Sequence, residues 1–429
     1  MNRFAFVAGV LALACPASLA SAEDAKGRPH ADNVIVVTFD GFRWQEMFGG
    51  YDATLNTKKD GGVGKPEPLA ARFDRPTPPA KAEDAKDRPR ADNVLVVTFD
   101  GFRWQEMFGG YDATLNTKRD GGVGKPEPLA ARFDRPTPEA RREALLPFIW
   151  TVVAREGQIL GDASRGSRVR ITNGFWFSYP GYNEMLAGFA DPRVDSNDKK
   201  PNPNLTVLEW LNRRPGFEGR VAAFASWDVL PFIVAAERSG VHANGDGPAV
   251  LEPVSDRELL LNAFTDDLPA YWADERFDAA TMQGALEYLR TRQPRVLYVM
   301  LGETDSWAHG RRYDVYLDAA WRSDRFVRRL WEEAQSLPAY RGRTALVLAT
   351  DHGRGETPLD WTDHGQKVPA AEPIWIAVMG PGTPALGVRE GVQATQSQLA
   401  ATVAALLGLG ADFQQAQPKA APPLPDLTP

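Results

Sequence analysis

Short apolar segments alternate along the chain with longer segments whose apolar residues recur every three to four positions. The short segments predict buried strands over residues 94–99, 168–172, 221–226, 295–301, 345–349 and 374–379. The longer segments predict helices over residues 139–154, 180–188, 206–213, 257–264, 279–292, 314–334 and 395–407. Strands that alternate with helices predict an α/β fold, a doubly wound, mainly parallel sheet with helices on both faces.

The first predicted strand occurs twice, because residues 22–81 and 82–141 form a near-identical tandem repeat. Solenoid proteins usually need three or more repeats, and their copies diverge. Two nearly unchanged copies therefore indicate either a recent duplication or an artefact of sequence assembly. Each copy ends its strand with an Asp-Gly pair, at Asp40 and at Asp100. The second copy continues directly into the helix predicted over 139–154. We therefore expect Asp100 to be the functional residue, with Asp40 as the alternative, and residues 23–81 to lie outside the catalytic domain of residues 82–410.

The two ends of the chain differ in character from the domain between them. Residues 1–22 resemble a secretory signal peptide, with Arg3, an apolar core over 4–14 and an Ala-Ser-Ala cleavage site at 20–22. The single cysteine, Cys15, lies in this segment, so the mature chain is expected to form no disulfide. No other apolar run is long enough to span a membrane, and we expect a secreted, periplasmic protein. Residues 411–429 are rich in Pro, Ala and Gln, which predicts a disordered tail.

Composition narrows the class of partner. The chain has 429 residues, of which 43% are hydrophobic and 24% charged, as in a soluble globular protein. Its net charge of −7 provides no basic excess to neutralise the phosphates of a nucleic-acid polymer. A small anionic substrate remains compatible with this charge if the site contains its own cations. Composition leaves the oligomeric state open.

Carboxylate and imidazole side chains follow several of the predicted strands. Asp100 follows the first strand, and Asp351 and His352 follow the strand over 345–349. Asp305 and His309, four residues apart after the strand over 295–301, would share one side of a helical turn. These are the ligand types of zinc, placed where open α/β sheets hold their active sites. Each motif alone has a plain alternative, a helix cap or a surface Asp–His contact.

A serine begins the helix predicted over 180–188. Ser178 precedes Pro180, which is typical of a helix N-terminus, where backbone N–H groups and the helix dipole favour an anion or an alkoxide. The alternative is that Ser178 serves only as an N-cap. The combination of Asp, Ser, Asp-x3-His, Asp-His and the later His364 favours one composite site over chance placement.

As an ordered set over about residues 92–410, these motifs resemble the alkaline phosphatase superfamily, nearest its nucleotide pyrophosphatase/phosphodiesterase branch. The resemblance implies two divalent metal ions, predicted to be zinc. It implies that one ion is held by Asp100, Ser178, Asp351 and His352, and the other by Asp305, His309 and His364. Asn197 also stands near the position where this family has an asparagine that hydrogen-bonds the phosphoryl oxygen, although its spacing from Ser178 is slightly shorter than in the family. Pro-Gly-Tyr at 180–182 departs from the more frequent Pro-Asn-His and leaves the substrate class open.

The predicted activity is hydrolysis of a small phosphate ester, as phosphodiesterase or phosphatase, through a phosphoserine on Ser178. A sulfatase is the first alternative, but Tyr182 occupies the position where formylglycine maturation needs arginine. A phosphoglycerate-mutase-like enzyme shares the metal pattern but belongs in the cytoplasm, contrary to the signal peptide. A secreted zinc-binding protein without activity is the third alternative, and the presence of Ser178 beside both ligand sets argues against it.

Overall fold

The computed structural model describes residues 90–245 and 247–427. The predicted signal peptide (1–22), the first copy of the repeat (23–81) and Asp40 lie outside these residues. Of the helices described, none is both long and apolar enough to cross a membrane.

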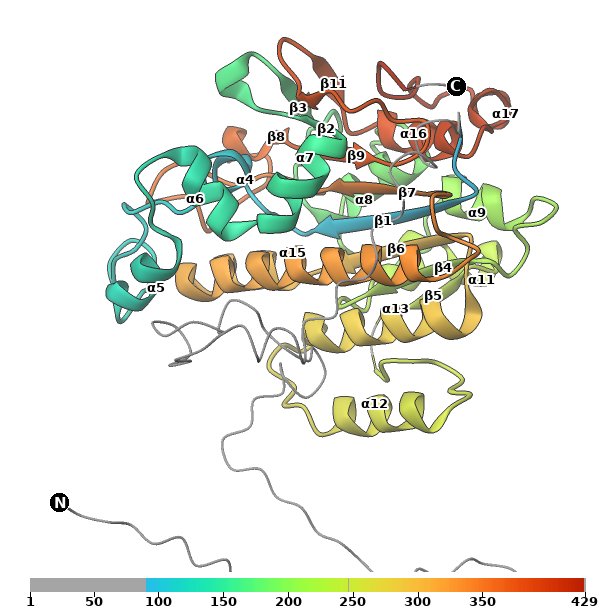
Figure 1. Ribbon diagram of the computed structural model, residues 1–429, viewed down its shortest axis with the longest axis horizontal. Helices are drawn as coiled ribbons and strands as arrows, with labels where there is room; N and C mark the ends of the chain where they lie inside the picture. The colour runs from blue at the N-terminus through green and yellow to red at the C-terminus, as the bar shows by residue number, and fades with distance from the viewer. Residues whose placement is uncertain (1–89, 246, 428–429) are drawn as a thin grey trace, which may run out of the picture. The chain divides into compact units, whose positions relative to one another are not determined.

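An eight-stranded sheet forms the centre of this part of the chain (Figure 1). Its order is β10-β2-β9-β7-β1-β6-β4-β5, and the pairs of β7, β1, β6, β4 and β5 are all parallel. Only β9 runs antiparallel to its two neighbours, β7 and β2. The strands are β1 Asn93–Phe99, β2 Gly157–Leu160, β4 Val221–Ala225, β5 His242–Asn244, β6 Val296–Leu301, β7 Thr344–Ala349, β9 Ile376–Met379 and β10 Gly387–Val388. The predicted mainly parallel sheet is confirmed.

Strand β1 has the central position between β6 and β7, and it comes from the second copy of the repeat. All seven of its residues are buried. Leu95 and Val97 pack into one hydrophobic core, and Val94 and Val96 into another on the opposite face. This alternation follows from the two-residue period of a strand, and burial on both faces explains why the segment is apolar throughout.

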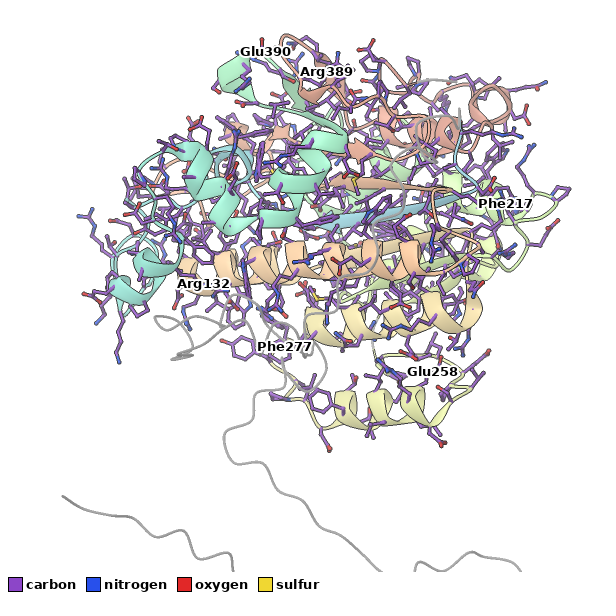
Figure 2. The ribbon with its side chains drawn as sticks, in the orientation of Figure 1. Arg132, Phe217, Glu258, Phe277, Arg389 and Glu390 are labelled. Atoms are coloured by element: carbon purple, nitrogen blue, oxygen red, sulfur yellow. The ribbon has the colours of Figure 1, made fainter. Side chains whose placement is uncertain are left out.

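Helices cover both faces of the sheet, as predicted. Helices α13 (Asp278–Arg292) and α15 (Tyr313–Ser336) pack on one face, and α8 (Ser178–Ala187), α9 (Val207–Asn212) and α16 (Gln398–Leu406) on the other. Side chains fill the space between the sheet and these helices (Figure 2). The remaining longer helices are α4 Trp104–Gly109, α5 Pro126–Phe133, α6 Pro138–Leu145, α12 Asp256–Asp266, α14 Glu303–His309 and α17 Gly410–Ala416. The short ones are α7 Ala154–Glu156, α10 Leu230–Ile233, α11 Ala236–Ser239, the 3-10 turns Ala163–Arg165 and Pro369–Ala371, and the π-turn Ile149–Val153.

The strand predicted over 374–379 is divided in two. Pro373–Ile374 forms β8 of a separate three-stranded sheet, ordered β11-β3-β8, whereas β9 belongs to the main sheet. The other members of the small sheet are β3 (Arg168–Arg170) and β11 (Gln393–Thr395). Between β8 and β9, the fully buried Trp375 donates its indole N–H to the carbonyl of Phe102 (3.0 Å). A continuous apolar run does not reveal where a strand changes partner.

The helix predicted over 139–154 is also interrupted. Helix α6 ends at Leu145, and a π-turn and α7 follow after Pro147. Proline has no N–H to donate and clashes with the preceding turn, so a continuous helix is excluded there. Asp324 of α15 accepts the free N–H groups of Phe148 and Ile149, each at 2.9 Å.

The described part of the C-terminal tail is ordered, contrary to the prediction for 411–429. Phe413 of α17 is fully buried and packs edge-on against Trp210, with ring centroids 5.1 Å apart. Beyond it, Leu424 is buried and the N–H of Ala421 donates to the carbonyl of Gly188 (2.8 Å). A few apolar side chains with a surface to cover outweigh a Pro- and Ala-rich composition, and composition alone does not show that surface.

Candidate metal centre

The predicted site residues meet at one edge of the sheet. Asp100 directly follows β1, and Asp351 and His352 directly follow β7. Asp305 and His309 lie on α14, which begins two residues after the end of β6. Because β6, β1 and β7 are parallel neighbours, their carboxyl ends lie side by side and bring these side chains together.

Asp100, Asp351 and His352 form the first cluster. All three are buried, and one donor atom from each lies within 4.8 Å of the others. His352 Nε2 lies 3.3 Å from Asp100 Oδ1 and 3.6 Å from Asp351 Oδ2. Ser178 Oγ lies 3.4 Å from the same nitrogen. The four residues predicted for the first metal ion are therefore in one place.

Ser178 is the first residue of α8, a helix of ten residues. Its hydroxyl therefore lies at the positive end of the helix dipole. Asn197 accepts the next backbone N–H, that of Tyr179, through its Oδ1 (3.0 Å). This bond places the carboxamide of Asn197 beside Ser178 and leaves its Nδ2 group as the donor available to an incoming oxygen.

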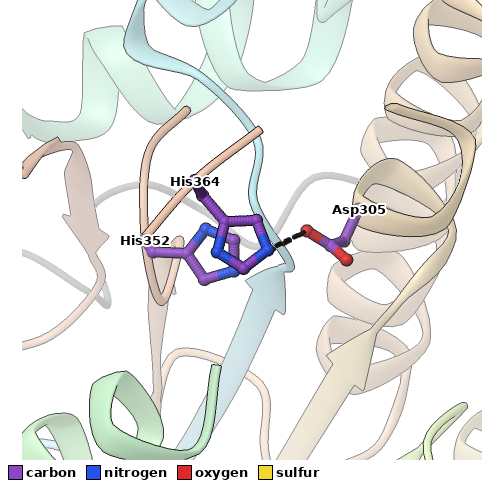
Figure 3. Close-up of side chains that lie close together, drawn as sticks. All are labelled: Asp305, His352 and His364. Carbon is purple, nitrogen blue, oxygen red and sulfur yellow. Dashed lines mark ion pairs between the residues drawn. The ribbon is translucent and has the colours of Figure 1, made fainter. Parts of the chain in front are cut away.

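Asp305, His352 and His364 also come together, with one donor atom from each within 4.8 Å of the others (Figure 3). His352 thus borders both predicted ligand sets, with its Nε2 3.6 Å from Asp305 Oδ1. We call Asp305, His364 and the adjoining His309 the second cluster. His309 Nε2 lies 3.2 Å from Asp305 Oδ2 and 2.9 Å from His364 Nε2. His364 Nε2 lies 3.7 Å from Asp305 Oδ1, and its ring stacks on that of His352 with centroids 4.0 Å apart. His309 is the most accessible member, with 46% of its side chain exposed. All seven predicted ligand residues are thus adjacent, and their role as ligands stays a prediction.

The hydrogen bonds around these side chains fit a cation. Each carboxylate of the first cluster is held by one oxygen only: the Tyr182 hydroxyl donates to Asp100 Oδ2 (2.7 Å), and the Gly101 N–H donates to Asp351 Oδ1 (3.0 Å). The other oxygens, Asp100 Oδ1 and Asp351 Oδ2, are buried and have no hydrogen-bond partner in the described part of the chain. A buried carboxylate oxygen without a donor is costly unless a cation binds it.

Hydrogen bonds at Nδ1 also orient His352 and His364 toward a cation. His352 Nδ1 lies 2.9 Å from the carbonyl of Gly353, and His364 Nδ1 lies 3.3 Å from the carbonyl of Trp176. A proton on Nδ1 satisfies each carbonyl and leaves each Nε2 lone pair directed into the site. Such outer hydrogen bonds are what a metal-binding histidine needs, and the nitrogen and oxygen donors together suit zinc.

The pKa shifts of Asp351 and His352 indicate an excess of negative charge in the first cluster. Burial raises the pKa of Asp351 well above its usual range, and the neighbouring Asp100 raises it further. Burial lowers the pKa of His352, but Asp351 and Asp100 outweigh it and bring that pKa to about 9. Both shifts favour uptake of positive charge, and a divalent cation would meet the same demand.

Three further side chains line the site, and none of them was predicted from the sequence to have a role there. Arg354 is fully buried and forms an ion pair with Asp305. Tyr182 orients Asp100, as described above. Glu275 accepts the hydroxyl of Ser306, beside Asp305; burial raises its pKa well above the usual range, and Asp305 and Asp100 add to the effect. Arg354 directly follows Asp-His-Gly and Tyr182 ends the unusual Pro-Gly-Tyr segment, so both had a signal in the sequence, whereas Glu275 had none.

Comparison with known proteins identifies the fold. No protein-family model and no curated protein sequence matches this chain. Among solved structures, alkaline phosphatase PafA is similar at a TM-score of 0.50 and 11% identity, over 80% of this chain and 99% of that one. The lipoteichoic acid synthase LtaP from Listeria monocytogenes is similar at a TM-score of 0.46 and 10% identity, over 76% of this chain and 73% of that one. The protein has the alkaline-phosphatase-like fold that the sequence predicted.

Proposed function

We propose that this protein is a metal-dependent hydrolase of phosphate esters in which Ser178 is the nucleophile. One observation supports this function above others: Ser178 Oγ lies beside His352, Asp100 and Asp351, whose free donor atoms point toward one another. Burial of two carboxylates beside this hydroxyl is costly, and bound cations would offset that cost. The fold agrees with the proposal, since enzymes named as phosphatases share it.

The chemistry assigned to each residue follows from its position. Two divalent ions, held by the two clusters, would stabilise the charge on the serine oxygen and on the leaving oxygen. Ser178 Oγ, at the N-terminus of α8, attacks phosphorus, and the ester oxygen departs and takes up a proton. Nδ2 of Asn197 donates a hydrogen bond to a phosphoryl oxygen. Water then cleaves the serine–phosphate ester and regenerates the hydroxyl.

The environment of Tyr182 weighs against the sulfatase alternative. Formylglycine maturation would need arginine at this position, and here the tyrosine is fully buried with its hydroxyl on Asp100. The residue thus belongs to the support of the first cluster. Phosphate-ester hydrolysis remains the proposal, and the choice between monoester and diester is left to the assay below.

We also propose that the protein is secreted, because residues 1–22 have the pattern of a signal peptide. N-terminal sequencing of the exported protein tests this, and we expect the mature chain to begin at Glu23. A chain that retains Met1 in the cytoplasmic fraction would contradict it.

The activity is tested with chromogenic phosphate monoesters, phosphodiesters and sulfate esters on protein loaded with zinc. We expect turnover of phosphate esters, loss of turnover after chelation and recovery on adding zinc back. Turnover of sulfate esters alone would favour the sulfatase alternative. Full turnover of phosphate esters by metal-free protein would contradict the proposed chemistry.

A further inference from the structure

Arg354 is a cation built into the wall of the site. Its side chain is fully buried, and its guanidinium donates to the carboxylate of Asp305, to the backbone carbonyl of Asp305 (3.2 Å) and to the carbonyl of Thr362. Asp305 lies on α14, and Thr362 lies two residues before His364. One buried arginine therefore joins the two segments that bear the second cluster.

The guanidinium faces both clusters. Gly101 has a left-handed backbone (φ 56°), and a Cβ added there would lie 2.8 Å from Asp305 Oδ1, 3.0 Å from Arg354 Nε and 3.0 Å from His352 Cε1. The three groups thus line one small space against the backbone that follows β1. Arg354 Nε is buried in that space and has no hydrogen-bond partner among the described residues. The positive charge is therefore held in place by the fold and is not screened by water.

This charge affects the two clusters unequally. The first cluster has two carboxylates, and within the described residues neither Asp100 nor Asp351 forms an ion pair with lysine or arginine. The second cluster has one carboxylate, that of Asp305, and Arg354 is paired with it. Counting one charge for each group, the first cluster has a ligand charge of −2 and the second, with Arg354, a charge of 0. Affinity for a divalent cation rises with the negative charge of its ligands.

We propose that Arg354 makes the two metal positions unequal, so that the cluster of Asp305, His309 and His364 binds its divalent ion more weakly than the first cluster. This inference rests on the proposed two-metal function. The second cluster includes the exposed His309, so an ion held there would be able to exchange with solvent. Arg354 thereby limits activity to conditions in which enough free metal is present to fill the second position.

Zinc titration of the metal-free, full-length protein by calorimetry tests the proposal without measuring activity. We expect two binding events whose dissociation constants differ by about 10- to 100-fold, the range that groups around a metal's ligands control. Arg354→Met is expected to tighten the weaker event by at least about tenfold, because loss of a full charge next to a divalent ion outweighs loss of hydrogen bonds to neutral carbonyls. Arg312→Met, which removes an arginine paired with Asp314 at the surface, is the matched control and leaves both events unchanged.

Two further variants make the result decisive. Arg354→Gln removes the charge but keeps an N–H donor for the Thr362 carbonyl, so it replaces Arg354→Met if the latter does not fold. His364→Ala identifies the weaker event, which disappears in that protein. Two equal affinities in the wild type, or a weaker second event in Arg354→Gln, would overturn the role of Arg354 while leaving the metal-dependent function intact. Absence of zinc binding in the wild type would overturn both.

Discussion

At the scale of one residue, Ser178 has two possible roles, as a helix cap or as a nucleophile. Ser178 is the first residue of α8, but the N-cap position belongs to Phe177, and the Ser178 hydroxyl instead lies 3.4 Å from His352 Nε2. The sequence alone left both interpretations open. What favours the catalytic one is the position of Asp100 and Asp351 around the same nitrogen.

Ser178→Ala tests this interpretation directly. The variant loses the attacking oxygen but keeps six side-chain ligands, so we expect zinc binding to persist while turnover falls on the order of 10³-fold or more. Ser178→Thr, which restores a hydroxyl, is expected to recover part of the activity. Acid-quenched wild-type protein is expected to carry phosphate on the tryptic peptide that contains Ser178. Near-normal turnover in Ser178→Ala would mean that water attacks directly.

At the scale of elements, the site depends on a close approach between α8 and the end of β7. Gly181 lies one turn into α8, and a Cβ there would lie 2.5 Å from the carbonyl oxygen of Asp351. The absence of a side chain at 181 therefore lets the helix bring Ser178 up to the first cluster. The same position forms part of the Pro-Gly-Tyr departure noted in the sequence, which thus has a packing reason.

Gly181→Ala is expected to move α8 away from Asp351. We expect a destabilisation of about 1–3 kcal/mol from overpacking and a loss of turnover of up to about 10²-fold from displacement of the nucleophile. Gly124→Ala is the matched control, because an added Cβ there meets nothing within 4 Å. Thermal unfolding and steady-state kinetics measure the two effects. Unchanged turnover in Gly181→Ala would show that the contact does not position Ser178.

Helix α15 contributes a pH-dependent contact through the buried Asp324, which accepts hydrogen bonds from two backbone N–H groups. Burial raises the pKa of Asp324 to about 7, even though the N–H groups of Phe148 and Ile149 lower it. Since the folded-state pKa exceeds the unfolded value, the folded form binds the proton more tightly. The contribution of Asp324 to stability is therefore complete at low pH and is lost as the pH rises through about 7.

Asp324→Asn removes this titration. The free energy of unfolding of the wild type minus that of the variant is expected to decrease between about pH 4 and pH 7, measured by denaturant unfolding across that range. Asp314→Asn, which replaces a partly exposed carboxylate at the start of the same helix, is the matched control. A difference for Asp324→Asn that is constant or grows with pH would contradict the assignment.

At the scale of the whole molecule, the main question is which copy of the repeated segment the fold needs. The second copy supplies β1 at the centre of the sheet, between β6 and β7, and every residue of the two clusters lies after position 90. A sheet has one place for this strand, because its register with both neighbours is already filled. The first copy is therefore not needed to complete the fold that the described residues form.

Deletion of residues 23–82 is expected to change the melting temperature and turnover little. In the full-length protein, Asp100→Ala is expected to abolish zinc-dependent turnover and Asp40→Ala to preserve it. The reverse pattern would mean that the first copy supplies the functional aspartate.

The sequence by itself determined the class of fold and predicted which side chains gather at one edge of the sheet, because both follow from local patterns in the chain. A buried parallel strand is continuously apolar, and a carboxylate or imidazole just after it lies at the carboxyl edge wherever the strand sits in the sheet. The positions of Asp100, Asp305 and His352 after their strands therefore predicted that these side chains would meet, and they do. It also predicted helices on both faces, since alternating strands and helices have few other ways to pack.

Only the tertiary structure decided features that depend on partners distant in sequence. Arg354 pairs with Asp305 across 49 positions, and Tyr182 donates to Asp100 across 82. The same is true of the change of sheet at Trp375 and of the burial of Phe413, which requires a surface made by α9. Sequence periodicity reports which face of an element is apolar, whereas the energy of an ion pair or a packed ring depends on which residue the fold brings opposite.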